Sequence, residues 1–336
     1  MKAVVLVGGE GTRLRPLTET RPKPLLPFMD RPFLHHVLDH LGRHGVQEAI
    51  LSSPYLEEEF RSFLEDRSGA PAATWVHESE PLGTCGAIVG ALAVLDGTFL
   101  VCNGDILTDL DLTSMVRAHR ERGAVATIAL TRVEDARPYG LVETDEEGRV
   151  AAFREKPEQR VAGWVNAGTY VLEPAALEGT PEGIPVSIER ETFPSIIARG
   201  DPVLGVFSSA YWRDLGTPES YLDAHLDALA GLVSGVRVAA PFIGAGAEVA
   251  PGAAVSETVV VGTGARVEAG AVLKRSVLHE RCRVDRDAKV EGSIVGRDAR
   301  VGAGAMVASS VLGDGAALAP GARIEGARVP PGAAVS

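Results

Sequence analysis

The last hundred residues contain a short repeat, and this repeat constrains the fold more tightly than any other feature of the chain. From Ile243 onward an aliphatic residue returns at steps of six or five positions. These aliphatic positions are Ile243, Val249, Val255, Val261, Val267, Leu273, Leu278, Val284, Val290, Val295, Val301, Val307, Leu312, Leu318 and Ile324. Neither a helix nor an ordinary strand has this period. It suits a parallel β-helix with three faces, in which each aliphatic side chain points inward and stacks on its equivalent one coil away.

Three steps make one coil, and the later coils are 17 residues long. Ser276, Ser293 and Ser310 recur at this spacing, and two aliphatic residues follow each of them. Glycine and alanine occupy many positions between the aliphatic residues, where the backbone must turn sharply and a larger side chain would be crowded. The pattern resembles the left-handed β-helix of hexapeptide-repeat proteins and covers residues 242–330.

The amino-acid composition changes where this repeat begins. Of the 17 aromatic residues, Phe242 alone lies beyond position 236. We therefore expect two domains, residues 1–234 and residues 235–336. The exposed end of a solenoid needs a cap, which packing against the first domain or a second copy of the chain would supply. We expect a homo-oligomer that assembles through the β-helix. Truncation of the chain near Gly235 should therefore leave a domain that folds but has a different oligomeric state.

The first domain alternates between strand-like and helix-like segments. The predicted strands are Val4–Val7, Ala49–Ser52, Thr74–His77, Phe99–Cys102 and Val125–Thr131, and the predicted helices are Pro32–His44, Glu57–Leu64, Gly86–Leu95 and Leu112–Arg122. This alternation predicts an α/β domain with a Rossmann-like, mostly parallel sheet covered by helices on both faces. Ligands of such sheets bind beyond the carboxyl ends of the strands.

Charge and hydropathy exclude several classes of protein. The 33 basic and 45 acidic side chains give a net charge of −12, which argues against a nucleic-acid-binding protein. No apolar run approaches the ~18 residues of a membrane span, and the apolar stretch at the N-terminus is shorter than the ~7–15 residues of a signal peptide. We therefore expect a cytoplasmic protein without a membrane partner. Cys85, Cys102 and Cys282 are too scattered for a disulfide framework and are expected to be small buried or half-buried thiols.

A glycine-rich loop follows the first predicted strand. Gly8, Gly9 and Gly11 precede Thr12 and Arg13, but the spacing fits neither a Walker loop nor a dinucleotide fingerprint. Such a loop still brings backbone N–H groups close to a phosphate. Arg13 and Lys23, the latter in Pro22-Lys-Pro24, would add the positive charge that a triphosphate requires.

These residues resemble the signature of the sugar-1-phosphate nucleotidylyltransferases. Six further elements appear in that family's order, namely Glu78–Thr84, Asn103–Asp105, Tyr139–Gly140, Phe153–Pro157, Asn166–Tyr170 and Trp212–Pro218. The resemblance covers nearly the whole chain, including the β-helix. Leu6-Val-Gly-Gly9, Pro22-Lys-Pro24 and the segment 185–194 are most similar to the mannose-1-phosphate guanylyltransferase branch.

The resemblance implies a role for each matching residue. The nucleotide site would comprise Gly8, Gly9, Gly11, Thr12, Arg13, Lys23, Glu78, Pro81, Gly83 and Thr84. The sugar-phosphate site would comprise Asp105, Gly140, Glu155, Lys156 and Asn166. Asp105 and Asp214 would hold Mg²⁺, and the catalytic set would be Arg13, Lys23, Asp105 and Lys156. The implied reaction joins a nucleoside triphosphate, here GTP, to a sugar 1-phosphate and releases pyrophosphate.

The base and the sugar are the less constrained part of this interpretation. Glu78 matches a base-contacting position, and a carboxylate, which only accepts hydrogen bonds, suits the N1–H and N2 amino group of guanine. If Glu78 instead pointed to solvent, the backbone would read the base. The alternatives are a glucose-1-phosphate thymidylyl- or uridylyltransferase, a non-catalytic regulatory subunit that binds sugar nucleotides, and an added acyl transfer on the β-helix with His279 as its base.

Overall fold

The computed structural model describes residues 1–55, 57–78 and 80–336, so Ser79 of the Glu78–Thr84 motif lies outside the described residues. Contacts within the chain divide it into two compact units. The first unit comprises Met1–Gly9 and His36–Trp212, and the second comprises Glu10–His35 and Arg213–Ser336. The glycine-rich loop from Glu10 onward therefore belongs to the same unit as the C-terminal repeat.

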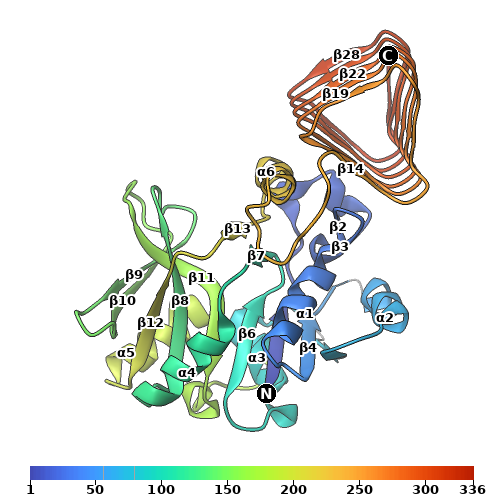
Figure 1. Ribbon diagram of the computed structural model, residues 1–336. Helices are drawn as coiled ribbons and strands as arrows, with labels where there is room; N and C mark the ends of the chain where they lie inside the picture. Colours follow the sequence, from blue (N-terminus) through green and yellow to red (C-terminus); the bar gives the residue numbers. More distant parts are fainter. Residues whose placement is uncertain (56, 79) are drawn as a thin grey trace. The chain divides into compact units, whose positions relative to one another are not determined.

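A nine-stranded sheet forms the centre of the first unit (Figure 1). Its strands are β1 (Lys2–Leu6), β4 (Glu48–Ser53), β5 (Ala72–His77), β6 (Phe99–Asn103), β8 (Ala126–Val133), β9 (Gly140–Thr144), β10 (Val150–Glu155), β11 (Gly163–Leu172) and β12 (Val203–Ser208). The neighbours β6, β1, β4 and β5 are all parallel, as are β8 and β12. Strand β11 runs antiparallel to β6 and β8 and joins these two parallel groups. This arrangement confirms the predicted Rossmann-like α/β fold.

Helices pack against this sheet. They are α1 (Phe33–Arg43), α2 (Glu57–Asp66), α3 (Gly83–Gly90), α4 (Leu112–Arg122) and α5 (Phe193–Ala198). Helix α4 has the predicted bounds because Asp111 caps its first turn by accepting a hydrogen bond from the Ser114 amide, and Gly123 ends it in the left-handed conformation. No helix among the described residues is long and apolar enough to cross a membrane.

Helix α3 differs from the prediction of 86–95. It begins at Gly83, where Val186 pairs with both sides of the helix start: its amide donates to the carbonyl of Leu82 at 2.9 Å, and its carbonyl accepts the Cys85 amide at 2.9 Å. It ends at Gly90, and a short 3₁₀ turn, Leu92–Val94, follows. The hydrophobic periodicity therefore identified the helical segment but not the backbone pairing that sets its start.

The core of the first unit follows from strands that are covered on both sides. Ala3, Val4 and Val5 are consecutive in β1 and fully buried, which is typical of a central parallel strand. Each fully buried valine side chain contributes roughly 1.5–3 kcal/mol. All three cysteines are also buried, as predicted for small apolar thiols.

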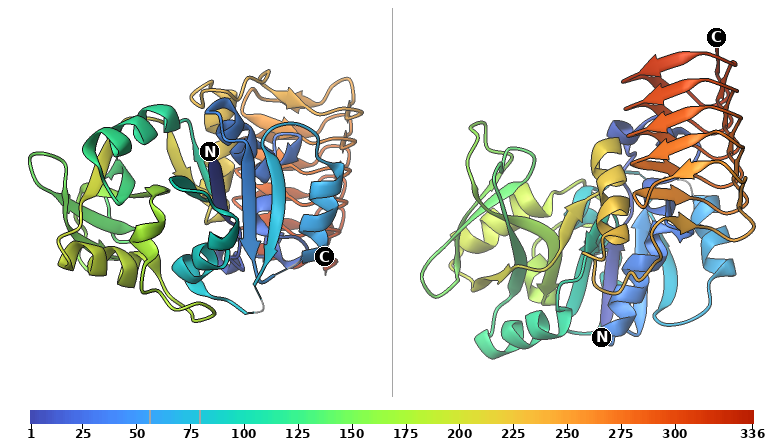
Figure 2. Two further views of the ribbon diagram at one scale, coloured as in Figure 1. Left: turned by 90° about the horizontal axis from the view of Figure 1, so that it is seen from below. Right: turned by 45° about the horizontal axis from the view of Figure 1, so that its top comes forward.

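The C-terminal repeat forms a three-sided parallel β-helix, whose coils stack one above another in Figure 2. One face contains β14 (Phe242–Ile243), β17 (Val259–Val261), β20 (Ser276–Leu278), β23 (Ile294–Val295), β26 (Val311–Leu312) and β29 (Arg328–Val329). The second contains β15 (Glu248–Val249), β18 (Arg266–Val267), β21 (Arg283–Val284), β24 (Arg300–Val301), β27 (Ala317–Leu318) and β30 (Ala334–Val335). The third contains β16 (Ala254–Val255), β19 (Val272–Lys274), β22 (Lys289–Glu291), β25 (Met306–Ala308) and β28 (Arg323–Glu325). The stacked parallel faces are consistent with the predicted left-handed β-helix.

The predicted inward residues form the interior of this β-helix. Val267, Val284, Val301 and Leu318 occupy equivalent positions on successive strands of one face and are at most 2% exposed. Ile243 and Val249 belong to the first coil and remain 43% and 37% exposed. The first coil has a neighbouring coil on one side only, which explains their exposure.

The recurring serines form a buried hydrogen-bond ladder. The Oγ atoms of Ser276, Ser293 and Ser310 each donate to the carbonyl two residues earlier, at 2.6–2.7 Å. The Ser293 and Ser310 hydroxyls also accept the backbone amides of Ser310 and Ala327, one coil later, both at 3.0 Å. The spacing of 17 residues thus places each hydroxyl where it satisfies an amide of the next coil.

We expect Ser293→Ala to lower the free energy of unfolding by about 1–3 kcal/mol, because the buried Ser310 amide would lose its acceptor. Urea or thermal unfolding measures this change. Ser309→Ala is the matched control, since Ser309 is exposed, and it should leave the stability near the wild-type value. Equal effects of the two substitutions would contradict a structural role for the ladder.

The second unit also contains the segments that flank the β-helix. They are the 3₁₀ turns Thr12–Leu14, Leu17–Glu19 and Lys23–Leu25, the short strands β2 (Pro27–Phe28) and β3 (Arg31–Pro32), and helix α6 (Pro218–Leu229). Tyr221 of α6 is fully buried and donates its hydroxyl to the carbonyl of Pro27. Its oxygen lies 3.1 Å from Nε2 of His279 on the β-helix. Helix α6 therefore joins the loop region to the repeat within this unit.

Candidate active site

The end of β1 and the turn after β6 lie side by side in the first unit. The amide of Gly104 donates to the carbonyl of Leu6 at 2.8 Å. A Cβ on Gly104 would lie 2.6 Å from Cγ1 of Val7, so only glycine fits there. A Cβ on Gly8 would lie 3.1 Å from the ring of Pro54, which is also a close approach. Asp105 directly follows this turn, at the carboxyl end of β6 where the sequence predicts a ligand site.

The second unit brings Arg13, Lys23 and Asp214 together. Nζ of Lys23 lies 3.4 Å from Oδ1 of Asp214, and Nη2 of Arg13 lies 3.8 Å from Oδ2. Asp214 ends strand β13 (Trp212–Asp214) and is separated from Lys23 by 191 positions. A Cβ on Gly216 would lie 2.6 Å from Nη2 of Arg13, so the glycine of the Asp-Leu-Gly motif makes room for the guanidinium. We call these three side chains the phosphate cluster.

The phosphate cluster combines a fixed cation with an accessible one. The Lys23 side chain is 9% exposed, whereas the Arg13 side chain is 63% exposed. Gly11 adopts a left-handed conformation with φ of +63°, and its carbonyl accepts the hydroxyl of Thr18 at 2.7 Å. Arg13 and Lys23 place two positive charges next to Asp214, and such cations suit a polyphosphate ligand. Thr12 starts the 3₁₀ turn that contains Arg13.

Glu78 is buried at 5% exposure and therefore does not point to solvent. Its Oε1 accepts the hydroxyl of Ser52 at 2.8 Å, and its Oε2 accepts the amide of Leu82 at 3.3 Å. Each carboxylate oxygen has two lone pairs, so these bonds leave acceptor capacity. Pro81 is exposed on the adjoining loop, and Gly83 is exposed at the first position of α3.

Glu189 connects two groups of predicted site residues, although no sequence motif indicated a role for it. Its Oε2 accepts the hydroxyl of Thr84 at 2.7 Å, and its Oε1 accepts the hydroxyl of Tyr170 at 3.3 Å. Asn166 donates its side-chain amide to Tyr170 at 2.7 Å and accepts the amide of Gly168 at 2.9 Å. The hydroxyl of Thr84 and both ends of the Asn166 side chain are thus engaged within the protein. The segment 185–194 indicated only similarity to one branch of the family. Nothing in one sequence distinguishes Glu189 from the neighbouring Glu191.

Glu155 and Lys156 lie at the end of β10. Nζ of Lys156 is 3.8 Å from Oε1 of Glu155, and the Lys156 side chain is 58% exposed while that of Glu155 is 20% exposed. Burial raises the pKa of Glu155, and the nearby Glu189 carboxylate adds to this increase. A Cβ on Gly140 would lie 2.6 Å from the ring of Phe153 and 2.9 Å from Oε2 of Glu155, so this glycine allows both side chains to occupy their positions.

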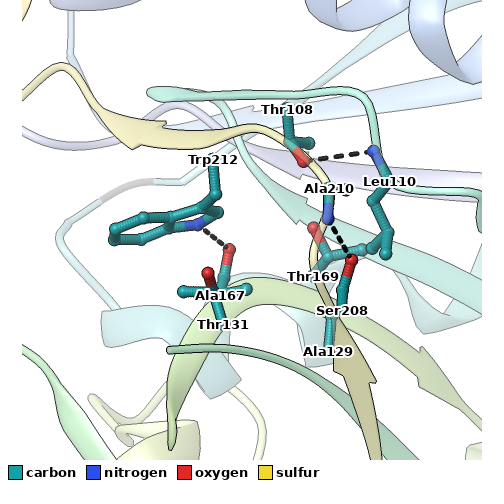
Figure 3. Close-up of a pocket in the computed structure, with 9 residues that line it drawn as sticks. All are labelled: Thr108, Leu110, Ala129, Thr131, Ala167, Thr169, Ser208, Ala210 and Trp212. Atoms are coloured by element: carbon teal, nitrogen blue, oxygen red, sulfur yellow. Dashed lines mark hydrogen bonds between the residues drawn. The ribbon is translucent and has the colours of Figure 1, made fainter. Parts of the chain in front are cut away.

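A small cavity lies beside Trp212, which precedes the Asp214 motif (Figure 3). The indole Nε1 donates to the carbonyl of Ala167 at 2.9 Å, and Thr131, Thr169 and Ser208 line the cavity. Its volume of about 10 Å³ accommodates at most one water molecule. This cavity therefore belongs to the packing that holds Trp212 and is not a substrate site.

His279 does not have the environment of a catalytic base. It is 2% exposed and contacts the hydroxyl of Tyr221. Burial lowers the pKa of His279 to about 4, and the charge of Arg21 opposes protonation further, whereas Glu280 and Asp314 favour it. This environment argues against acyl transfer on the β-helix.

We expect the burial of His279 to make the protein less stable in acid. Its folded pKa of about 4 lies below the unfolded value of about 6.5, so the unfolded chain binds more protons and stability falls as the pH decreases from about 6.5 to about 4. At pH 5 the loss from this group is on the order of 2 kcal/mol. Urea unfolding at pH 8 and pH 5 should show a smaller difference for His279→Gln than for wild type. Parallel pH dependences of the two proteins would contradict this account.

The comparisons with known proteins cover both parts of the chain. The profile of the nucleotidyl transferase family matches residues 2–231. The chain belongs to the nucleotidyl transferase family. A second profile, that of the GMPPB C-terminal domain, matches residues 238–336 of this nucleotidyl transferase.

Several relatives of this nucleotidyl transferase are similar over most of their length. A mannose-1-phosphate guanylyltransferase of Mycobacterium tuberculosis is 41% identical over 296 residues, covering 86% of this chain and 82% of that protein. Mannose-1-phosphate guanylyltransferase 1 of Arabidopsis thaliana is 36% identical over 303 residues, covering 87% and 83%. A UTP–glucose-1-phosphate uridylyltransferase of Synechocystis is 32% identical over 332 residues, covering 86% of each chain. Among solved structures, HddC from Yersinia pseudotuberculosis complexed with GMP-PN is 30% identical with a TM-score of 0.59, covering 67% of this chain and 97% of that one.

Proposed function

We propose that this nucleotidyl transferase transfers the guanylyl group of GTP to mannose 1-phosphate and releases pyrophosphate. The observation that carries the proposal is the phosphate cluster, in which Lys23 and Arg13 surround Asp214 at the signature positions of the family. The names of the relatives from Mycobacterium tuberculosis and Arabidopsis thaliana support GTP and mannose 1-phosphate as substrates. The product would be GDP-mannose.

The chemistry requires positioning and charge neutralisation. A phosphate oxygen of the sugar 1-phosphate attacks the α-phosphorus of GTP, a new P–O bond forms, and the bond to the pyrophosphate oxygen breaks. The attacking oxygen is already anionic, so no protein base has to remove a proton. Arg13, Lys23 and the loop amides from Gly8 to Gly11 would neutralise the charge that develops on the triphosphate.

The donor chemistry of Asp105 and Asp214 fits a divalent cation. Mg²⁺ takes oxygen ligands and is commonly held by one or two carboxylates together with substrate phosphates. Asp214 is 18% exposed beside Lys23 and Arg13, and Asp105 follows the tight Gly104 turn. We propose that these two carboxylates hold Mg²⁺, which would polarise the phosphates when bound.

The sugar phosphate would be bound by groups of the first unit. The exposed ammonium of Lys156 would pair with its phosphate, and the half-buried Glu155 would accept hydrogen bonds from sugar hydroxyls. Gly140 leaves room for Glu155, and Asn166, engaged with Tyr170, would present its remaining amide hydrogen.

The nucleotide preference depends on Glu78 in this proposal. Its buried carboxylate accepts two protein hydrogen bonds and retains capacity for the N1–H and N2 amino group of guanine. We expect Glu78→Gln to lower the ratio of kcat/KM for GTP over that for dTTP by about 10- to 100-fold, the effect of removing one charged hydrogen-bond acceptor. Steady-state assays with each nucleotide measure the ratio.

Glu80→Gln is the matched control, because Glu80 is exposed two positions away. It should keep the wild-type ratio. If Glu78→Gln retained the wild-type preference for GTP, Glu78 would have no part in base recognition. The base would then be recognised by backbone groups.

The alternatives make different predictions for the same assay. The Synechocystis relative favours a uridylyltransferase that uses glucose 1-phosphate. A non-catalytic binding subunit would bind nucleotide without turnover, but Arg13, Lys23 and Asp105 are all present. We therefore propose to monitor pyrophosphate release by the full chain with GTP, with mannose 1-phosphate, and with both. Release that requires both substrates supports the transferase, whereas binding without release supports the regulatory subunit.

We also propose the division into residues 1–234 and 235–336, with the β-helix as the site of homo-oligomerisation. The exposed Ile243 and Val249 of the first coil support an uncapped end. Light scattering of the full chain and of residues 1–234 tests this proposal. A truncated chain that keeps the assembly state of the full chain would contradict it.

A further inference from the structure

The stacking of coils places charged residues in register along one corner of the β-helix. Glu280, Arg297 and Asp314 are spaced by 17 residues, each two positions after the last strand residue of the face that contains β20, β23 and β26. Their charges alternate. The Arg297 amide donates to Oδ1 of Asp314 at 2.9 Å, and its guanidinium lies 3.1 Å from Oδ2. We call these three residues the charged column.

The loop that carries the phosphate cluster is attached to this column. Nη2 of Arg21 lies 2.7 Å from Oε1 of Glu280 and 3.8 Å from Oδ2 of Asp314. The hydroxyl of Thr20 donates to Oδ2 of Asp314 at 2.8 Å. The side chains of Arg21 and Asp314 are only 14% and 10% exposed, so water and salt screen the ion pair between them far less than a surface ion pair. The last coils add a further contact, because Nη1 of Arg328 donates to the carbonyl of Arg13 at 3.0 Å.

The loop has little regular structure of its own to fix its shape. Between Gly11 and Leu26 it consists of three short 3₁₀ turns, which have few internal hydrogen bonds. Lys23 follows Arg21 by two residues, and Arg328 holds the backbone of Arg13 itself. Arg13 and Lys23 are the two cations of the phosphate cluster, so a displacement of this loop would displace both.

We propose that the charged column of the β-helix positions the nucleotide-binding loop through Arg21, Thr20 and Arg328. Glu280 and Asp314 are therefore positioning residues for the transfer reaction, although they lie in the repeat. The inference rests on the proposed function only in that the loop is taken to bind the nucleoside triphosphate. Small displacements of groups that orient a reacting phosphate have large effects on rate.

Asp314→Asn and Arg21→Gln test the proposal in the full chain. We expect each to raise the KM for the nucleoside triphosphate by about tenfold or more, and to lower kcat, while the KM for the sugar 1-phosphate stays within about twofold. Arg21→Lys should restore most of the loss because it keeps the charge. Asp287→Asn is the matched control, since Asp287 is exposed on a different corner of the β-helix and has a left-handed backbone that asparagine also adopts. It should have wild-type kinetics.

A positioning role raises the KM for the nucleoside triphosphate but not the KM for the sugar 1-phosphate, whereas a purely structural role lowers only the stability. Variants with lowered melting temperature and wild-type KM for the nucleotide would overturn the proposal, as would equal increases in both KM values. The assay uses whichever nucleoside triphosphate the wild-type protein turns over. If the protein uses a nucleotide other than GTP, that nucleotide replaces GTP in the assay. The effect of the charged column on its KM can still be measured.

Discussion

Asp214→Asn is expected to lower kcat by about 10³-fold or more while the protein stays folded. Asparagine has nearly the same shape as aspartate, so it keeps the packing beside Gly216, but it loses the charge that would hold Mg²⁺ and that faces Lys23 and Arg13. Loss of a metal carboxylate removes several kcal/mol of transition-state stabilisation. Asp105→Asn is expected to have a similar effect. Turnover at saturating Mg²⁺, together with circular dichroism as a check on folding, measures both.

Asp201→Asn is the control for these two substitutions. The Asp201 side chain is 41% exposed and pairs with Arg199 at 2.9 Å, so neutralising it should leave turnover unchanged. Near-normal kcat in either Asp214→Asn or Asp105→Asn would remove that carboxylate from the proposed metal site. Restoration of activity by a higher Mg²⁺ concentration would instead support a role in metal affinity.

Lys23→Met is expected to reduce kcat/KM for the nucleotide by about 10²- to 10³-fold. The ammonium of Lys23 is held 3.4 Å from Asp214 in a nearly buried position, so a phosphate would meet a fixed charge that costs little to reorganise. Methionine keeps most of the buried stem and removes only the charge. Steady-state kinetics with the nucleotide varied at saturating sugar phosphate measures the effect.

Lys289→Met provides the comparison, because Lys289 is exposed on strand β22 of the β-helix. It should have wild-type kinetics. An alternative role for Lys23 is merely to balance the charge of Asp214. In that case Lys23→Met would change the stability and leave kcat/KM within about twofold, and the double variant with Asp214→Asn would recover the stability.

The β-helix was predictable in detail because every coil obeys the same local rule. The aliphatic residue at each step, the small corner residues and the serine of each later coil are visible in the sequence, and stacking follows from their spacing. Val284 therefore has the predicted burial. The exposure of Ile243 has a non-local cause, since it depends on the first coil having one neighbour.

Sequence motifs indicated the residues of the candidate site but not the contacts among them. Motifs indicated Arg13, Lys23 and Asp214 separately, yet their proximity depends on how segments 191 positions apart fold together. The hydrogen bonds of Glu189 to Thr84 and Tyr170 likewise join three distant segments. Periodicity and local propensity carry no information about such pairs.

The most direct test of the account is the substrate specificity of the wild-type protein. ATP, CTP, GTP, UTP and dTTP are each paired with mannose, glucose and N-acetylglucosamine 1-phosphates in the presence of Mg²⁺, and kcat/KM is determined from the nucleotide sugar formed. We predict that GTP with mannose 1-phosphate has the highest kcat/KM and that GDP-mannose is the product. A higher kcat/KM for UTP or dTTP with glucose 1-phosphate would contradict it.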